Sequence, residues 1–238
     1  MRIPIGNTPD VLSEATADVA FLLMLATSRK AFHLHKTIAR GEWTFFRPKA
    51  NLGVELKNKT LGIFGLGRIG VEMAKRCKGA YHMNVMYCNR SRNLAVEELL
   101  QAQKVEFDEL CVQSDVLSVH CSLNEATKEI FNKTAFHKMK RTAIFINTAR
   151  GLIHNEKDLI DALNERVIWG AGLDVTNPEP MRPNNPLLSM ESVAVLPHIG
   201  SATIEARNAM ARLSAENIIH GLRGVRLQNI VNPEIYSC

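Results

Sequence analysis

The stretch GIFGLGRIG, from Gly62 to Gly70, decides the fold of this 238-residue chain. Its apolar beginning predicts a short buried strand, and the sequence from Arg68 to Lys78 predicts a helix. Three glycines at this spacing also occur in turns that bind nothing, so the motif gains meaning only from its position between a strand and a helix.

In that position each glycine has a separate task. Gly65 permits the tight turn after the strand, Gly67 lets the backbone approach a pyrophosphate, and Gly70 lets the helix pack closely on the sheet. The N-terminus of the helix, with Arg68 and Ile69, offers free N–H groups to the anion. We therefore expect a dinucleotide cofactor at this turn.

The rest of the chain alternates apolar runs with helical patterns. Strands too uniformly apolar for a one-sided sheet, separated by helices, predict an α/β fold with a doubly wound parallel sheet, a Rossmann-like NAD(P)-binding domain. The expected strands are 61–65, 84–88, 116–123, 143–149, 170–175 and 192–197, and the expected helices are 13–41 (one long helix or two abutting ones, with Ser13 as its cap), 68–78, 95–102, 156–165 and 203–222.

Composition excludes several classes of protein. Hydrophobic residues make up 46% and charged residues 22% of the chain, as in an ordinary globular protein. The net charge of +5 is spread along the sequence, without a basic block interleaved with aromatic residues. We expect a modestly basic surface and no binding of nucleic acid.

The five cysteines do not form a metal or disulfide pattern. Cys77, Cys88, Cys111, Cys121 and Cys238 include no CxxC pair, so we expect no metal site and a reducing compartment. The opening residues lack the apolar core of a signal peptide, and the apolar run 19–26 is too short to span a bilayer. These features favour a cytoplasmic protein that does not bind membranes.

The end of the second expected strand bears on which cofactor is bound. Cys88 or Asn89 stands where an Asp or Glu would grip the ribose hydroxyls of NAD, and Arg90, Ser91 and Arg92 follow. Neutral residues followed by arginines can accept a 2′-phosphate through charge-assisted hydrogen bonds. We expect NADP(H) to be preferred over NAD(H), the alternative being that both arginines are solvated loop charges.

Three further stretches lie at later strand ends, where an open α/β sheet binds its ligands: NTARG (147–151), LDVTNPEP (173–180) and PHIGSAT (197–203). With GLGRIG and GEWTFFRP (41–48), they resemble the D-isomer-specific 2-hydroxyacid dehydrogenases, and within that family the glyoxylate/hydroxypyruvate reductases. The resemblance extends over nearly the whole chain. Several motifs in family order are far more specific than one glycine pattern.

The resemblance implies four site residues. Arg150 matches the arginine that binds the carboxylate and carbonyl of a 2-oxo acid, for which its planar fork is suited. His198 matches the general acid and base, since an imidazole can exchange protons near neutral pH. Glu179 matches the carboxylate that orients His198, and Asp174 matches an aspartate at the nicotinamide end. Asn147 is expected to help shape the same strand end.

The resemblance also implies a division of the chain. Residues 1–11 match a hinge segment that follows an N-terminal substrate domain in relatives, residues 12–203 match the dinucleotide-binding domain, and residues 204–238 match the C-terminal helix and tail of the substrate domain. Relatives begin with a longer N-terminal stretch that supplies a substrate loop and a lid. We expect an incomplete active site, the chain being either a natural short isoform or the product of an incomplete gene model.

Without the longer N-terminal stretch of relatives, apolar residues that would pack on it are left exposed. We expect Phe21, Leu22, Phe45 and Phe46 to be exposed unless a homodimer covers them, because relatives of this family pair through this region. The expected function is reduction of a small 2-oxo acid by NADP(H), with His198 as the proton donor. The alternative is an inactive cofactor-binding module or nucleotide-sensing scaffold of the same family.

Overall fold

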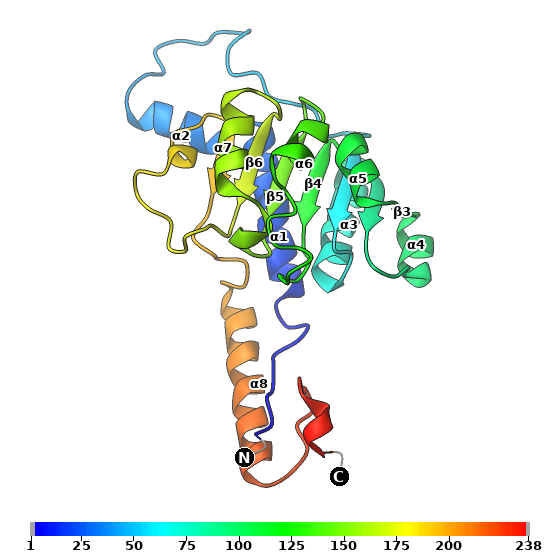
Figure 1. The fold of residues 1–238 in the computed structure, drawn as a ribbon. Coiled ribbons are helices and arrows are strands. Elements are labelled where there is room, and N and C mark those ends of the chain that lie inside the picture. Colours follow the sequence, from blue (N-terminus) through cyan, green and yellow to red (C-terminus); the bar gives the residue numbers. More distant parts are fainter. Residues whose placement is uncertain (1–2, 237–238) are drawn as a thin grey trace.

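The computed structural model describes residues 3–236, so Cys238 lies outside the described part. Its centre is a parallel sheet with strand order β3-β2-β1-β4-β5-β6-β7 (Figure 1). Within the described part the strands are β1 (Thr60–Phe64), β2 (Asn84–Cys88), β3 (Gln103–Lys104), β4 (Val116–Val119), β5 (Ile144–Asn147), β6 (Gly170–Leu173) and β7 (Val193–Val195).

Helices cover both faces of this sheet and bury one apolar cluster on each. Helices α1 and α3 cover one face, and α5, α6 and α7 cover the other. The α-helices are α1 (Ser13–Ser28), α2 (Ala31–Ala39), α3 (Arg68–Tyr81), α4 (Leu94–Leu100), α5 (Phe107–Gln113), α6 (Lys133–Lys138), α7 (Glu156–Asn164) and α8 (Ile204–Leu222), with 3₁₀ turns at Gly151–Ile153, Pro186–Leu188 and Pro233–Tyr236. The α/β class and the doubly wound parallel sheet are thereby confirmed.

The opening helical pattern forms two abutting helices, one of the two expected arrangements, because Lys30 adopts a left-handed conformation with φ of 54° between them. Other details differ from the expectation. Ser13 is the first helical residue and not its cap, since Leu12 holds the cap position without a side-chain hydrogen bond. Strand β3 and helices α5 and α6 were not expected, since their 2, 7 and 6 residues are too short for a clear period.

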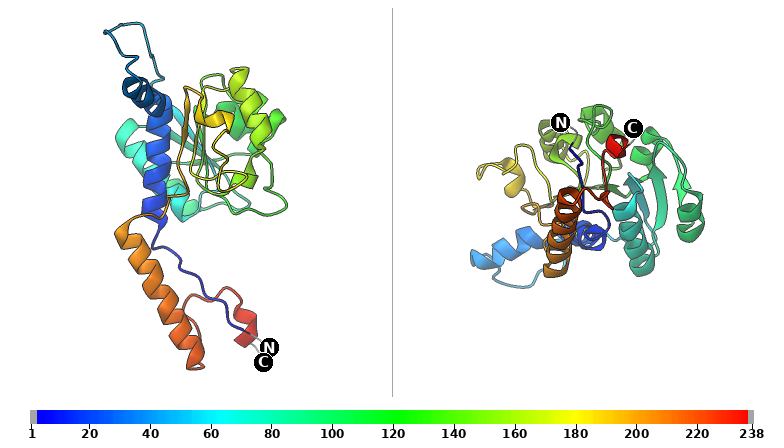
Figure 2. Two further views of the ribbon diagram at one scale, coloured as in Figure 1. Left: turned by 90° about the vertical axis from the view of Figure 1, so that its left-hand side faces the viewer. Right: turned by 90° about the horizontal axis from the view of Figure 1, so that it is seen from below.

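The two ends of the chain leave the sheet together. Helix α8 projects away from the body, and the first residues run beside it toward the C-terminal tail (Figure 2). Val231 N–H donates to Ile5 O at 2.8 Å, Asn7 N–H donates to Asn229 O at 3.0 Å, and Asn217 Nδ2 donates to Asn7 O at 3.1 Å. These bonds join the beginning and the end of the chain into one appended unit.

The expected exposure of apolar residues holds at three of four positions. Leu22, Phe45 and Phe46 are exposed, with Phe46 reaching 79%. Phe21 is half-buried, because its ring packs on Tyr81 with centroids 6.1 Å apart. In residues 3–236 no helix is long and apolar enough to cross a membrane.

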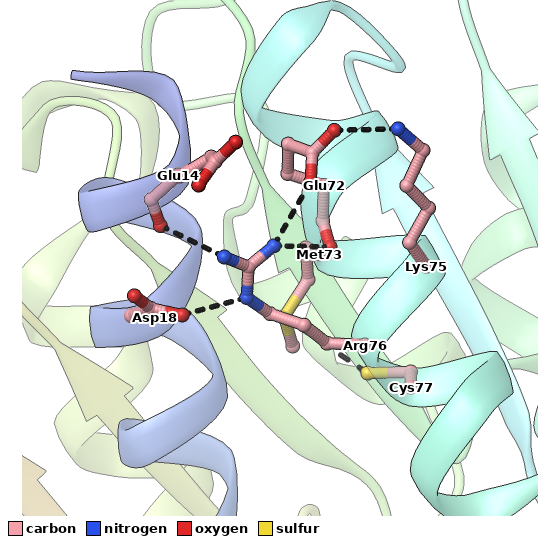
Figure 3. Close-up of polar contacts among 7 residues, drawn as sticks. All are labelled: Glu14, Asp18, Glu72, Met73, Lys75, Arg76 and Cys77. Carbon is pink, nitrogen blue, oxygen red and sulfur yellow. Dashed lines mark hydrogen bonds and ion pairs between the residues drawn. The ribbon is translucent and has the colours of Figure 1, made fainter. Parts of the chain in front are cut away.

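A clamp of charged groups joins α1 to α3, the helix that begins at the glycine turn (Figure 3). Arg76 Nε donates to Asp18 Oδ1 at 2.6 Å, and its Nη2 donates to the Glu14 carbonyl at 3.4 Å. Its Nη1 donates to the carbonyl and carboxylate of Glu72, at 3.0 and 3.1 Å. The Arg76 side chain is only 22% exposed, so this clamp is partly shielded from water.

Replacing Arg76 with Met tests the clamp. We expect the free energy of unfolding to fall by about 1–3 kcal/mol, since hydrogen bonds between charged groups are lost at a half-buried position. The control is Lys75→Met, because Lys75 is 47% exposed and bonds Glu72 on its own helix. Its effect should stay within about 0.5 kcal/mol. Equal losses for the two variants, measured by chemical unfolding, would contradict the clamp.

Candidate active site

The expected site residues gather at one edge of the sheet. The turn at Gly65 follows β1, Asn89 follows β2, Asp174 follows β6 and His198 follows β7. Because every strand runs in the same direction, all these carboxyl ends meet at one edge. Strand β1 lies between β2 and β4, which is the topological switch point where such sheets bind ligands.

The three glycines of the turn differ in what surrounds them. A Cβ on Gly65 would lie 2.6 Å from Cys121 N, and its φ is +100°. A Cβ on Gly70 would lie 2.7 Å from Gly65 O. Within residues 3–236, no atom beyond the two chain neighbours of Gly67 lies within 4 Å of such a position, and no side chain there caps α3, which Gly67 precedes. The open space at Gly67 fits a close-lying pyrophosphate at a helix N-terminus.

Asn89 bonds the backbone of the glycine turn, whereas Arg68 points to another segment. Leu66 N–H donates to Asn89 Oδ1 at 2.7 Å, and Asn89 Nδ2 donates to Leu66 O at 3.3 Å. Arg68 is exposed and forms an ion pair with Asp10, and Ile69 beside it is half-buried. The Asn89 side chain therefore fixes the backbone of the glycine turn, a task that the sequence had not indicated.

The arginines after β2 differ in their ion pairs. Arg90 and Ser91 are exposed, and Arg90 has no ion pair within residues 3–236. Arg92 binds Glu97 through two nitrogens, with Nε 3.1 Å from Oε1 and Nη2 in contact with Oε2. A guanidinium group free to meet a phosphate is therefore present at Arg90, whereas that of Arg92 is engaged.

His198 and Glu179 form a direct pair. His198 Nδ1 contacts Glu179 Oε1, although the two residues lie on different loops. Both side chains are open to solvent, at 46% and 40% exposed. His198 has a φ of 54°, which turns the chain sharply at the end of β7. With Nδ1 occupied by the carboxylate, Nε2 is the ring nitrogen that remains for a ligand.

The environment of Glu179 keeps it ionised. Partial burial disfavours its charged form, but hydrogen bonds from His198 and from the Thr176 N–H, with the charges of His198 and Arg150, outweigh burial and lower the pKa of Glu179. The positive charge of Arg150 acts on Glu179 from the loop after β5. Gly151 permits this approach, since a Cβ there would lie 2.0 Å from Thr176 O.

Asp174 is buried and bonds the loop that carries His198. Its Oδ1 accepts from Ile199 N–H at 2.8 Å and its Oδ2 from Gly200 N–H at 2.7 Å. Burial raises the pKa of Asp174, against the opposing effect of these two bonds. Thr16 of α1 donates to Gly200 O at 3.0 Å. The two contacts fix the backbone directly after His198.

Arg150 is exposed at the end of β5, and Asn147 shapes its loop. Asn147 Nδ2 donates to Arg150 O at 2.9 Å and to His154 Nδ1 at 3.0 Å, while its Oδ1 accepts from Ala149 N–H at 2.9 Å. Arg150 Nη1 donates to Ala149 O at 2.6 Å. The other nitrogens of its guanidinium group form no hydrogen bond or ion pair within residues 3–236.

Two histidines at this edge, the half-buried His120 and the buried His154, escaped the sequence reasoning. His120 contacts Ser118 Oγ at 2.8 Å and Thr148 Oγ1 at 3.3 Å, which joins β4 to the loop after β5. His154 is fully buried, and its Nε2 has no partner in the described residues. Burial lowers the pKa of His120 to about 3 and that of His154 to about 4. No local pattern marked His120, because it fell inside the expected strand 116–123, whereas β4 ends at Val119.

The buried His154 should make the protein sensitive to acid. Unfolded His154 takes up a proton below its ordinary pKa of 6.5, whereas folded His154 does so only near 4. Between these values the unfolded state binds more protons, so stability falls as pH falls. As the pH falls from 7 to 5, the unfolding free energy of wild type should fall by about 1–2 kcal/mol more than that of His154→Gln. Urea unfolding measures this difference.

The matched control is His137→Gln, because His137 is an exposed histidine on α6. Its unfolding free energy should follow that of wild type across the same pH range. If the His154→Gln curve also ran parallel to wild type, His154 would not carry the acid sensitivity.

The donor groups at this edge suit a dinucleotide better than a metal. An open glycine turn, an uncapped helix start and exposed arginines match phosphate and ribose groups. No group of three or more His, Cys, Asp or Glu side chains in residues 3–236 is placed to hold a metal ion.

Comparisons with known proteins agree with this geometry. Residues 21–200 match the model of the D-isomer specific 2-hydroxyacid dehydrogenase, NAD binding domain. The probable 2-ketogluconate reductase of Dictyostelium discoideum is 41% identical over 234 residues, which cover 98% of this chain and 70% of that protein. The glyoxylate reductase/hydroxypyruvate reductase of Homo sapiens is 44% identical over 222 residues, 93% of this chain and 68% of that protein.

Among solved structures, a glyoxylate reductase from Paecilomyes thermophila superposes with a TM-score of 0.88 at 38% identity, covering 98% of this chain and 69% of that one. The family model spans most of the chain and includes the glycine turn, Arg150, Glu179 and His198. The chain therefore belongs to the D-isomer-specific 2-hydroxyacid dehydrogenases, which are NAD(P)-dependent oxidoreductases.

Proposed function

We propose that this protein reduces a small 2-oxo acid of the glyoxylate or hydroxypyruvate type to the D-2-hydroxy acid, with NADP(H) as cofactor and His198 as the proton donor. The observation that carries the proposal is the His198–Glu179 pair, which lies at the same sheet edge as Arg150 and the open glycine turn. The names of the human relative and of the Paecilomyes thermophila structure support this substrate class, and the Dictyostelium relative is named for another 2-oxo acid.

His198 supplies the proton in this proposal. Glu179 accepts from Nδ1, so the protonated ring presents Nε2–H to the carbonyl oxygen of the substrate. When bound, the reduced nicotinamide supplies the hydride that reaches the carbonyl carbon. Proton and hydride together convert the 2-oxo acid to the 2-hydroxy acid, and His198 is left neutral. The lowered pKa of Glu179 keeps the partner of His198 negatively charged throughout.

Arg150 holds the substrate. Its guanidinium group is exposed beside Glu179, and a planar fork of donors matches the carboxylate and carbonyl oxygens of a 2-oxo acid. Negative charge that develops on the reacting oxygen is stabilised by the same group. Asn147 donates a hydrogen bond to the loop that carries Arg150, and Asp174 accepts one from the loop that carries His198. The backbone that carries each of these two groups is therefore held in place.

The cofactor preference rests on the end of β2. No carboxylate stands at Cys88 or Asn89, where NAD-specific folds place an acidic residue. Arg90 is exposed and free of ion pairs within residues 3–236, and can therefore meet a 2′-phosphate. We assign the pyrophosphate to Gly65, Gly67, Arg68, Ile69 and Gly70, and the nicotinamide end to Asp174.

A second candidate is a cofactor-binding module without turnover. It is favoured by the openness of the pair, since His198 is 46% and Glu179 40% exposed. A site that excludes water strengthens its electrostatic interactions, and an open site forgoes that gain. This candidate and the reductase share the cofactor site and differ in catalysis.

Two structural proposals accompany the function. Residues 1–11 and 204–238, as far as they are described, form a unit apart from the sheet, which supports their assignment to a second, substrate domain. A homodimer is supported by the exposed aromatic residues of the segment after α2, where Trp43, Phe45 and Phe46 are 66%, 59% and 79% exposed. The free thiols of the described cysteines support a reducing, cytoplasmic location.

Replacing His198 with Ala tests the reductase. NADPH oxidation with glyoxylate or hydroxypyruvate should fall about 100- to 10,000-fold, the usual effect of losing a general acid. NADPH affinity should stay unchanged, and His137→Ala, an exposed control, should retain full activity. If wild type binds NADPH but leaves both acids unreduced, the cofactor-binding module is the function.

The dimer has its own test. Light scattering should give a molar mass of twice 26.5 kDa for wild type. Phe46→Ser should shift the mass toward the monomer, because it removes the most exposed aromatic ring of the segment after α2. The control is Leu99→Ser, which alters a residue 62% exposed on α4. A monomeric wild type, or equal shifts in both variants, would contradict a dimer formed through this segment.

A further inference from the structure

The ion pair between Arg92 and Glu97 bears on cofactor choice. Arg92 and Arg90 both follow β2, where the adenosine ribose is proposed to bind, yet they differ in their partners. Arg92 donates from Nε and Nη2 to the two oxygens of one carboxylate, whereas Arg90 has no ion pair within residues 3–236. A guanidinium fork bound in this bidentate manner cannot offer the same nitrogens to a phosphate.

Glu97 is held in place independently of Arg92. Its side chain is only 12% exposed, and the Tyr87 hydroxyl contacts Glu97 Oε1. Tyr87 is fully buried in β2, and its hydroxyl also accepts from Asn93 N–H at 3.1 Å. Asn93 in turn caps α4, whose Val96 N–H donates to Asn93 Oδ1 at 3.3 Å. The carboxylate is therefore fixed by the sheet and by the start of α4.

The charge of Glu97 is secure near neutral pH. Hydrogen bonds from Arg92 and then from Tyr87 lower the pKa of Glu97 to about 2. A 2′-phosphate reaching for Arg92 must displace this carboxylate and approach its negative charge. Arg92 is itself 63% exposed, so it has room to change partner once Glu97 releases it.

We propose that Glu97 is a specificity-determining residue: by holding Arg92 it leaves Arg90 as the main ligand of a 2′-phosphate and limits the preference for NADP(H) over NAD(H). This inference rests on the proposed function, in that the cofactor must place its adenosine ribose at the end of β2. It assigns unequal roles in phosphate binding to Arg90 and Arg92, which lie two positions apart in the sequence.

The test compares two probes that differ by one phosphate, adenosine 2′,5′-bisphosphate and 5′-AMP, by isothermal titration of the whole 238-residue chain. The measured quantity is the ratio of their affinities. Wild type should favour the bisphosphate, and Arg90→Gln should reduce the ratio about tenfold or more, the effect of losing one charge-assisted hydrogen bond. Arg92→Gln should change the ratio by less than about threefold.

Glu97→Gln is the decisive variant. It retains an acceptor for Tyr87 but removes the charge that holds Arg92, so the ratio should rise about three- to tenfold. The double variant Glu97→Gln, Arg92→Gln should lose this gain. The matched control is Glu98→Gln, because Glu98 is exposed on the same helix without an ion pair in the described residues, and a general change in charge would act equally there. Circular dichroism verifies that each variant is folded.

The outcomes separate the two proposals. If both probes bind and Glu97→Gln leaves the ratio unchanged, or matches Glu98→Gln, the role of Glu97 is wrong while the cofactor site stands. If Arg92→Gln lowers the ratio as much as Arg90→Gln, the inference is equally overturned. If folded wild type binds neither probe, the cofactor site of the proposed function fails, and the role of Glu97 falls with it.

Discussion

The parallel direction of the seven strands in the described part of the chain is the constraint on which the site depends. Each strand ends at the same edge, so the loops after β1, β2, β5, β6 and β7 all begin there. The turn after β1 fits only because Gly65 lacks a side chain, since its backbone lies against Cys121 at the end of β4. A side chain at Gly65 would push apart the two central strands between which the sheet reverses its order.

Most polar side chains at that edge bind the protein itself. Asn89 holds the glycine turn, Asn147 the loop of Arg150, and Asp174 the loop of His198. Each such bond contributes about 0.5–1.5 kcal/mol to stability, and together they fix backbone on which exposed groups stand. The groups left free, Arg90 and His198 Nε2 among them, can then act on a ligand without first having to be ordered.

Hydrophobic periodicity in the sequence predicted the strands and the longer helices. It did not predict which side chains would contact one another. The periods of the strands and long helices were sufficient for the sheet, and the motifs were sufficient to identify the edge where Arg150, Glu179 and His198 lie. The partner of each side chain was not predictable. Arg92 differs from Arg90 through its ion pair with Glu97, which the Tyr87 hydroxyl of β2 contacts, and no sequence pattern indicated which arginine Glu97 would bind. The buried His154 packs on Phe145, with ring centroids 5.7 Å apart, which the sequence did not indicate either.

The pairing of the two chain ends has a mechanical consequence. Residues 3–11 and α8 connect to the body by two separate crossings, and Thr16 bonds Gly200 where these crossings enter it. One crossing would let the appended unit swing in any direction, whereas two crossings restrict its motion to rotation about the line that joins them. Asp10 of the first crossing binds Arg68 of the glycine turn, and the second crossing continues directly from the loop of His198. Any turn of the appended unit therefore acts on both ends of the site at the same time.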